Sequence, residues 1–392
     1  GINRAGLFRL PELRGRPGYE GFLNDSVVTF ATLLRDSGYH TYATGKWDPG
    51  TQPGQLPFDH GFEKSFVLAA GGASHFDDMA GTTRPVAVVP YYEDDRKVEK
   101  LPEDFFSSEF YTDRIIDYIE SNDDDAPFLA YLSYTAAHWP LQVPDDWLDR
   151  YDDQYEEGWH EVRRARFNRQ KDAGVVPPHT QMSPEHPSVQ NWDDLLPAQR
   201  EVELKRMRIY AAMIENMDFH IGRLLTELRE RDSERETFVI FVSDNGAEGN
   251  AIDGIMDNAY WIPSNFDNRI DNIGRQGSYQ WQGLGWAQAS VAPFHLHKSY
   301  TTAGGLRTPA IVYSSSGRTG GENRDAIVTV RDIAPTILAL AGVEKPDGSY
   351  RGRLVHKMSG SSMLDYLAGD AETVHGNEPL GWELYGSRAL IK

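Results

Sequence analysis

The stretch Thr237-Phe-Val-Ile-Phe-Val-Ser-Asp-Asn-Gly246 decides the fold class, because it joins an apolar strand pattern to a polar turn. Residues 238–242 are β-branched or aromatic, which is typical of a strand buried on both faces of a helix-covered sheet. Ligands of open α/β sheets bind outside the carboxyl ends of the strands, so Asp244 and Asn245 would lie at that edge. A carboxylate and an amide carbonyl suit Ca²⁺ or Mg²⁺. Taken alone, the pattern also fits an ordinary Asp-Asn-Gly turn.

The segments around this stretch alternate between helix and strand patterns. Periodicity predicts helices at 27–37, 109–121, 201–232 and 329–341, and strands at 39–43, 127–134 and 308–314. Weak periodicity predicts loop over 51–104 and an insertion of short helices and loop over 145–200. This alternation predicts an α/β fold with a mixed, mostly parallel central sheet flanked by helices. We expect a main domain at 1–345, lacking its first strand, and the start of a small, incomplete C-terminal α+β subdomain at 346–392.

The composition excludes several classes of partner and site. The 392 residues carry 39 basic and 59 acidic side chains, a net charge of −20, which disfavours nucleic acid and anionic membranes as partners. A small anionic substrate remains compatible, since an acidic protein can contain a local basic pocket. No apolar run approaches the ~20 residues of a transmembrane helix. The absence of cysteine excludes thiolate metal sites and a cysteine nucleophile. Oligomeric state and compartment do not follow from these numbers.

Side chains suited to oxyanion binding lie near the predicted strand ends. Lys46 follows the first strand and His138 the second, whereas Lys298 lies in a loop that precedes Gly-Gly-Leu-Arg-Thr-Pro (304–309). If these loops converge beside Asp244 and Asn245, two lysines and a histidine surround an anion next to a metal site. Lysine ammonium groups act on sulfate or phosphate oxygens as point charges, and a metal acts as a Lewis acid. Singly, each residue also fits an ordinary surface lysine or a packed loop histidine.

Taken in order, these segments resemble the type I sulfatase family of the alkaline-phosphatase-like superfamily. The resemblance covers nearly the whole chain and is carried by Gly-Tyr-His-Thr-Tyr-Ala-Thr-Gly-Lys-Trp (38–47), Asp-His-Gly-Phe-Glu (59–63), Pro-Phe-Leu-Ala-Tyr…Ala-His-Trp-Pro (127–140), Ser-Asp-Asn-Gly-Ala-Glu-Gly (243–249) and Asp-Ile-Ala-Pro-Thr (332–336). It implies a sulfuric ester hydrolase of the arylsulfatase type, which cleaves a small-molecule sulfate ester to an alcohol or phenol and sulfate.

The resemblance also implies roles for individual residues. Asp244 and Asn245 would be ligands of Ca²⁺ (or Mg²⁺). Lys46 would contact the sulfate and the nucleophile, and His138 would bind a sulfate oxygen. Lys298 would stabilise the sulfate and the leaving oxygen, the task of a preorganised positive charge. The family nucleophile is a formylglycine made from Cys or Ser. Its [Cys/Ser]-x-Pro/Ala-x-Arg motif is not in this chain, and we expect it ahead of Gly1.

One motif departs from the family pattern. The family sequence Gly-Lys-Trp-His-x-Gly is Gly-Lys-Trp-Asp-Pro-Gly (45–50) here, so Asp48 stands where the proton-accepting histidine is expected. A carboxylate with an ordinary pKa near 4 is a weak base, and in its ionised form it repels sulfate. We therefore expect the chain as given to be inactive. The alternative to a sulfatase fragment is a catalytically inactive sulfatase-like protein, and a phosphatase or phosphonate hydrolase is a weaker third candidate.

Overall fold

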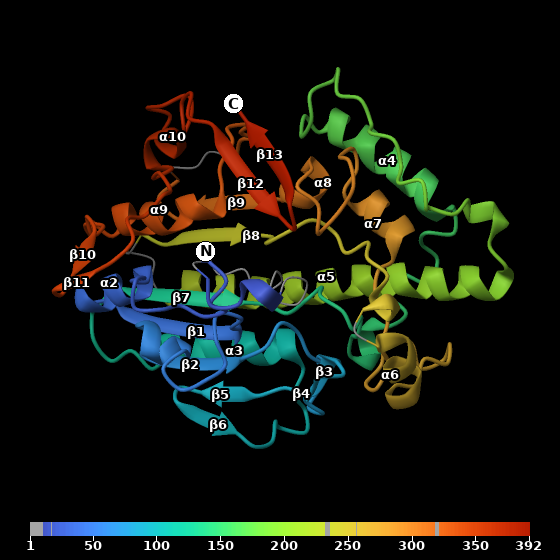
Figure 1. The fold of residues 1–392 in the computed structure, drawn as a ribbon, viewed down its shortest axis with the longest axis horizontal. Helices are drawn as coiled ribbons and strands as arrows, with labels where there is room; N and C mark the ends of the chain where they lie inside the picture. The colour runs from blue at the N-terminus through green and yellow to red at the C-terminus, as the bar shows by residue number, and fades with distance from the viewer. Residues whose placement is uncertain (1–10, 17, 232–235, 256, 318–320) are drawn as a thin grey trace.

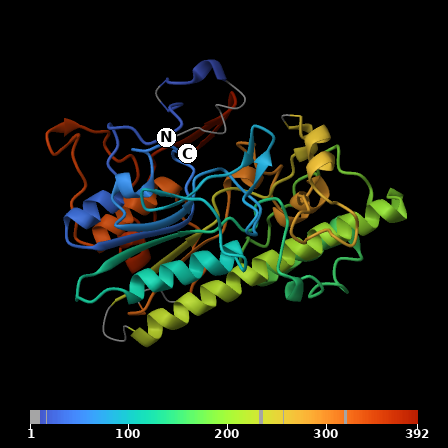
Figure 2. The same ribbon diagram turned by 90° about the horizontal axis from the view of Figure 1, so that it is seen from below.

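A computed structural model describes residues 11–16, 18–231, 236–255, 257–317 and 321–392. A central sheet is layered between helices (Figure 1). Figure 2 shows the helices α3 (Ser107–Glu120) and α5 (Pro197–Arg231) running side by side below the sheet. The helices α2 (Phe30–Asp36) and α9 (Ile333–Leu340) pack against one another, and α2 also packs on the sheet. The predicted helix-flanked α/β fold is confirmed.

The central sheet has five strands and mixed direction. Its order is β6-β5-β2-β1-β7, with bounds Arg96–Val98, Tyr91–Glu93, Lys64–Leu68, His40–Lys46 and Phe128–Ser133. Strand β1 is parallel to both of its neighbours, β2 and β7. Strands β2, β5 and β6 pair antiparallel. The parallel β1 and β7 therefore end at the same edge of the sheet, which places the loops that follow them together.

Strand β8 (Phe238–Val242) pairs antiparallel with β9 (Ala310–Ser314) in a separate two-stranded sheet. This pair lies beyond β7, on the side away from β1 (Figure 1). The prediction that β8 is buried on both faces is wrong, since its residues are half-buried and Val242 is exposed. Within the described residues β8 has a hydrogen-bonded neighbour on one edge alone, and this explains its incomplete burial.

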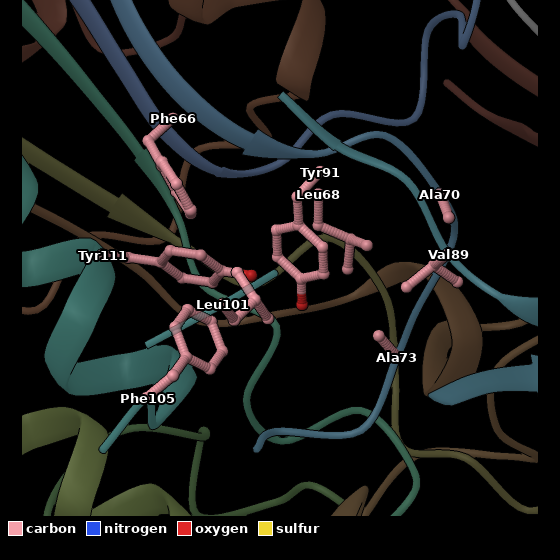
Figure 3. Packing of buried hydrophobic residues seen from close by; sticks show 9 residues of the cluster. All are labelled: Phe66, Leu68, Ala70, Ala73, Val89, Tyr91, Leu101, Phe105 and Tyr111. Carbon is pink, nitrogen blue, oxygen red and sulfur yellow. The ribbon is translucent and has the colours of Figure 1, made fainter. Parts of the chain in front are cut away.

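One cluster of the hydrophobic core lies between the sheet and α3. Figure 3 shows its nine buried side chains, which are Phe66, Leu68, Ala70, Ala73, Val89, Tyr91, Leu101, Phe105 and Tyr111. Full burial of one large apolar side chain stabilises a fold by about 1.5–3 kcal/mol. Ala70 and Ala73 belong to this cluster and flank two glycines, so the cluster also fixes the loop that follows β2.

Residues 51–104 contain five short strands, where the sequence predicted loop. They are β2, β5 and β6 of the central sheet and the pair β3 (Ala80–Thr83) and β4 (Val86–Val88). Strands of three to five residues are too short to show a clear alternation, which is why the prediction failed. The 145–200 stretch contains α4 (Gly158–Asp172), a 15-residue helix where shorter ones were expected.

The remaining elements surround the sheet. The helices are α6 (Asn258–Asn265), α7 (Leu284–Ser290), α8 (Ala303–Leu306) and α10 (Leu364–Ala368). Two antiparallel pairs complete the chain, β10 (Ser349–Tyr350) with β11 (Arg353–Leu354) and β12 (Leu380–Leu384) with β13 (Ser387–Ile391). In the described part of the chain, no helix combines the length and apolar character needed to cross a membrane.

A buried carboxylate connects α9 to the C-terminal segment. Asp332 is fully buried and accepts hydrogen bonds from the backbone N–H groups of Thr329 (2.7 Å) and Ser361 (2.9 Å). Its Oδ2 also lies 2.9 Å from Nε2 of His375. These bonds join residues 361–375 to the start of α9. A domain boundary near residue 345 stays a prediction.

Candidate active site

Lys46 and His138 come together because β1 and β7 are adjacent and parallel. Lys46 is the last residue of β1, and His138 lies in the loop that follows β7. Gly45 faces Ser133 across the pair, and a Cβ at Gly45 would lie 2.0 Å from the Ser133 carbonyl oxygen. Only glycine allows this approach, and its φ of +97° also favours glycine.

His138 lies within the electrostatic reach of both predicted lysines. Its pKa is held well below the usual value, first by burial and then by the positive charges of Lys298 and Lys46. Its Nδ1 donates to the Trp139 carbonyl oxygen at 2.7 Å, so in the neutral ring Nε2 carries the lone pair. The fold thus brings together Lys46, His138 and Lys298, the three residues that the sequence placed on separate loops.

His75, which no sequence pattern singled out, supports the backbone of His138. His75 is buried, and burial lowers its pKa to about 4. Its Nε2 donates to the His138 carbonyl oxygen at 3.2 Å, and its Nδ1 lies 2.7 Å from Ser107 Oγ. A neutral His75 with the proton on Nε2 satisfies both bonds and fixes the backbone of the His138 loop. No sequence signal distinguishes this histidine from any other in a Gly-rich loop.

Asp48 and His138 both face the two glycines that follow Ala70. A Cβ at Gly71 would lie 3.6 Å from Asp48 Oδ1, and a Cβ at Gly72 would lie 3.0 Å from His138 Nδ1. Both side chains therefore pack on the same loop after β2. The carboxylate at the family's histidine position is thus in the neighbourhood of the two lysines and His138.

The turn that carries Asp244 and Asn245 packs on the segment that follows Lys298. Asp244 is exposed and Asn245 is half-buried. The next residue, Gly246, donates its N–H to the Gly305 carbonyl oxygen at 3.2 Å, and a Cβ there would lie 1.8 Å from the Gly304 carbonyl oxygen. The backbones of the two segments touch, which explains the glycine at 246, whereas a Cβ at Gly304 or Gly305 would meet backbone oxygens of residues 295–300.

Lys298 is held by a second residue that the sequence analysis did not single out. Its backbone N–H donates to the Ala247 carbonyl oxygen at 3.0 Å, and its Nζ lies 3.2 Å from Glu248 Oε2. Glu248 Oε1 accepts the backbone N–H of Asn250 at 3.0 Å and also the Asn250 side-chain amide. The position of the Lys298 ammonium is therefore set by the loop that follows β8.

The described residues do not form a complete metal site. Asp244 and Asn245 have the oxygen donors that Ca²⁺ and Mg²⁺ prefer, but two donors fall short of the six to eight that Ca²⁺ takes. Within 11–16, 18–231, 236–255, 257–317 and 321–392, no three His, Cys, Asp or Glu side chains gather closely enough to hold an ion.

Comparison with known proteins shows which family the chain belongs to. The sequence profile of the sulfatase family matches residues 10–343. The chain belongs to the sulfatase family. It is 38% identical over 385 residues to an uncharacterised sulfatase of Schizosaccharomyces pombe, covering 96% of this chain and 70% of that one. It is 37% identical over 368 residues to the arylsulfatase of Klebsiella aerogenes, covering 92% and 77%.

Solved structures show the same fold. The crystal structure of Ps i-CgsB matches with a TM-score of 0.57 and 20% identity, covering 90% of this sulfatase chain. This chain spans 60% of the length of Ps i-CgsB. Membership of the family and the 37% identical arylsulfatase support sulfate ester hydrolysis as the family reaction.

Proposed function

We propose that this sulfatase chain holds the sulfate group of a small sulfate monoester between the Lys46 ammonium, the Lys298 ammonium and the His138 imidazole. The observation that supports this most directly is that Lys46 and Lys298, from separate segments, both lie close enough to His138 for their charges to lower its pKa. The charges of Lys46 and Lys298 repel a proton on the His138 ring. A bound sulfate would offset that repulsion, and Nε2 of His138 could then carry a proton and donate to a sulfate oxygen.

The three residues divide the work of binding and charge stabilisation. Lys46 and Lys298 supply fixed charge to the sulfate oxygens, and Lys298 also faces the leaving oxygen as it gains charge. His138 orients the anion. The nucleophile that we propose is the formylglycine of the family, which has no counterpart in these 392 residues because they contain no [Cys/Ser]-x-Pro/Ala-x-Arg motif. We also propose that Asp244 and Asn245 supply two oxygens to a Ca²⁺ or Mg²⁺ ion, which would polarise the sulfate when bound.

A calorimetric titration with inorganic sulfate tests this binding site. Lys46→Ala and Lys298→Ala should each weaken sulfate binding about tenfold or more, because a hydrogen bond to a charged group contributes about 1.5–3 kcal/mol. Lys97→Ala is the matched control, since Lys97 is an exposed lysine paired with Glu99. Equal sulfate affinity in the parent chain and in all three variants would contradict the proposal.

Asp48 favours a second candidate, a catalytically inactive sulfatase-like protein. Its carboxylate replaces the family's histidine and packs against the same glycine loop after β2 as His138 does. Hydrolysis of a chromogenic aryl sulfate with added Ca²⁺ separates the two candidates. We expect no turnover by these 392 residues, and turnover that Lys46→Ala abolishes would contradict inactivity. In a chain extended to include the nucleophile, Asp48→His should raise activity.

A further inference from the structure

Glu248 is an acidic side chain in direct contact with Lys298, one of the two lysines proposed to bind sulfate. Its Oε2 lies 3.2 Å from Lys298 Nζ, and its side chain is only 15% exposed. The family roles described above assign nothing to this position. Its location raises the question of why an anion-binding lysine should carry its own counter-charge.

The contacts of Glu248 keep the carboxylate fixed and ionised. Oε1 accepts two donors from Asn250, and Trp139 Nε1 points to Oε2 at 3.5 Å. Asn250 is held in turn by Ser299 Oγ at 3.1 Å. Burial would raise the pKa of Glu248, but the charge of Lys298 and the Asn250 hydrogen bonds outweigh it and lower the pKa. Every group in contact with this carboxylate is a hydrogen-bond donor. A glutamine here would keep one acceptor oxygen but place its NH₂ group against the donors on the other side.

The substrate and the product of a sulfatase differ in charge. A sulfate monoester carries one negative charge. Its hydrolysis by water gives the alcohol and hydrogensulfate, which loses its proton in neutral solution and becomes a dianion. A fixed negative charge beside the site repels a dianion about twice as strongly as a monoanion at the same position. A counter-charge next to Lys298 therefore disfavours the product more than the substrate.

We propose that Glu248 sets the charge preference of this site, so that the site favours monoanionic sulfate monoesters over dianions and releases inorganic sulfate. The inference rests on the proposed function, because it requires the anion to bind at Lys298. It also makes Glu248 a discriminating residue against phosphate monoesters, which are largely dianionic near neutral pH. Glu248 acts on the anion through its charge and need not touch the substrate.

The test compares two anions of similar shape and different charge. Calorimetry at pH 7.5 or so gives the affinity of the chain for inorganic sulfate, a dianion, and for methyl sulfate, a monoanion. Glu248→Gln should tighten sulfate binding more than methyl sulfate binding. The ratio of the two dissociation constants should change about tenfold, as expected for one extra charge at about 6 Å in an effective dielectric of about 40.

Two further variants separate charge from shape. Glu248→Asp keeps the negative charge and shortens the side chain, so both affinities should change together and their ratio should stay near that of the parent. Glu215 lies on α5 and forms an exposed ion pair with Arg150. Glu215→Gln removes this distant negative charge and should leave both affinities unchanged. Thermal unfolding of each variant confirms that the proteins compared are folded.

The outcomes distinguish this inference from the proposed function. If the parent chain binds neither anion, or binds them independently of Lys46, the proposed function fails. If binding depends on Lys46 but Glu248→Gln shifts both affinities equally or not at all, the charge-preference role of Glu248 is overturned. A ratio altered as much by Glu248→Asp as by Glu248→Gln would likewise overturn it, because shape and not charge would then be responsible.

Discussion

The ion pair between Lys298 and Glu248 should show a measurable coupling in the free energy of unfolding. Its two atoms are 3.2 Å apart, and the side chains are 26% and 15% exposed, between a surface pair and a fully buried one. Exposed pairs contribute about 0–1 kcal/mol, whereas breaking a buried pair costs about 3–5 kcal/mol. We therefore expect a coupling of about 2 kcal/mol between Lys298→Met and Glu248→Gln.

The assay is a double-mutant cycle in which tryptophan fluorescence monitors urea unfolding of each variant. The double variant should be less destabilised than the sum of the two single variants, since the second substitution removes the group that the first leaves unpaired. Lys100 and Glu103 form the control pair, with a similar distance of 3.0 Å but exposed fractions of 71% and 87%. That cycle should show no measurable coupling. Additive effects at Lys298 and Glu248, within about 0.5 kcal/mol, would refute our account of how Lys298 is held.

Three other predictions concern the surrounding structure. Gly246→Ala should destabilise the fold by about 1–3 kcal/mol in urea unfolding, because its Cβ would lie 1.8 Å from the Gly304 carbonyl oxygen. Burial would raise the pKa of Asp332, but its hydrogen bonds lower it. Its contribution to stability should be complete above the ordinary aspartate pKa and decline as pH falls below it. Melting temperatures of parent and Asp332→Asn should therefore converge in acid. Asp244→Ala should abolish any rise in melting temperature on adding Ca²⁺; an unchanged rise would exclude Asp244 as a ligand.

The meeting of Lys46 and His138 could be predicted because it depends on regular structure. The segments that form β1 and β7 overlap the strands predicted at 39–43 and 127–134, and parallel neighbours end at one edge of a sheet. The 201–232 periodicity likewise predicted α5, observed at Pro197–Arg231. In each case the sequence pattern is local and repeats over several residues. General rules of sheet or helix geometry then predict where the side chains lie.

The supporting residues could not be predicted, because their roles depend on how irregular loops fold. Glu248 reaches Lys298, about fifty residues later in the chain, because the Lys298 backbone N–H bonds the Ala247 carbonyl oxygen. His75 supports His138 by a hydrogen bond to its backbone carbonyl. Every residue has a backbone carbonyl, so the sequence does not indicate such a contact. The predicted burial of β8 was too high because an apolar run shows only that a strand favours a buried position. How far it is buried depends on the elements that pack beside it.

The central claim is that one anion occupies the space shared by Lys46, His138 and Lys298. Crystals of this chain soaked in sodium selenate, a sulfate analogue with anomalous signal from selenium, test it most directly. The account predicts one anomalous peak within hydrogen-bonding distance of both lysine ammonium groups and of His138 Nε2, lost in Lys46→Ala. A peak elsewhere, or side chains of these three residues turned toward different faces, would contradict it.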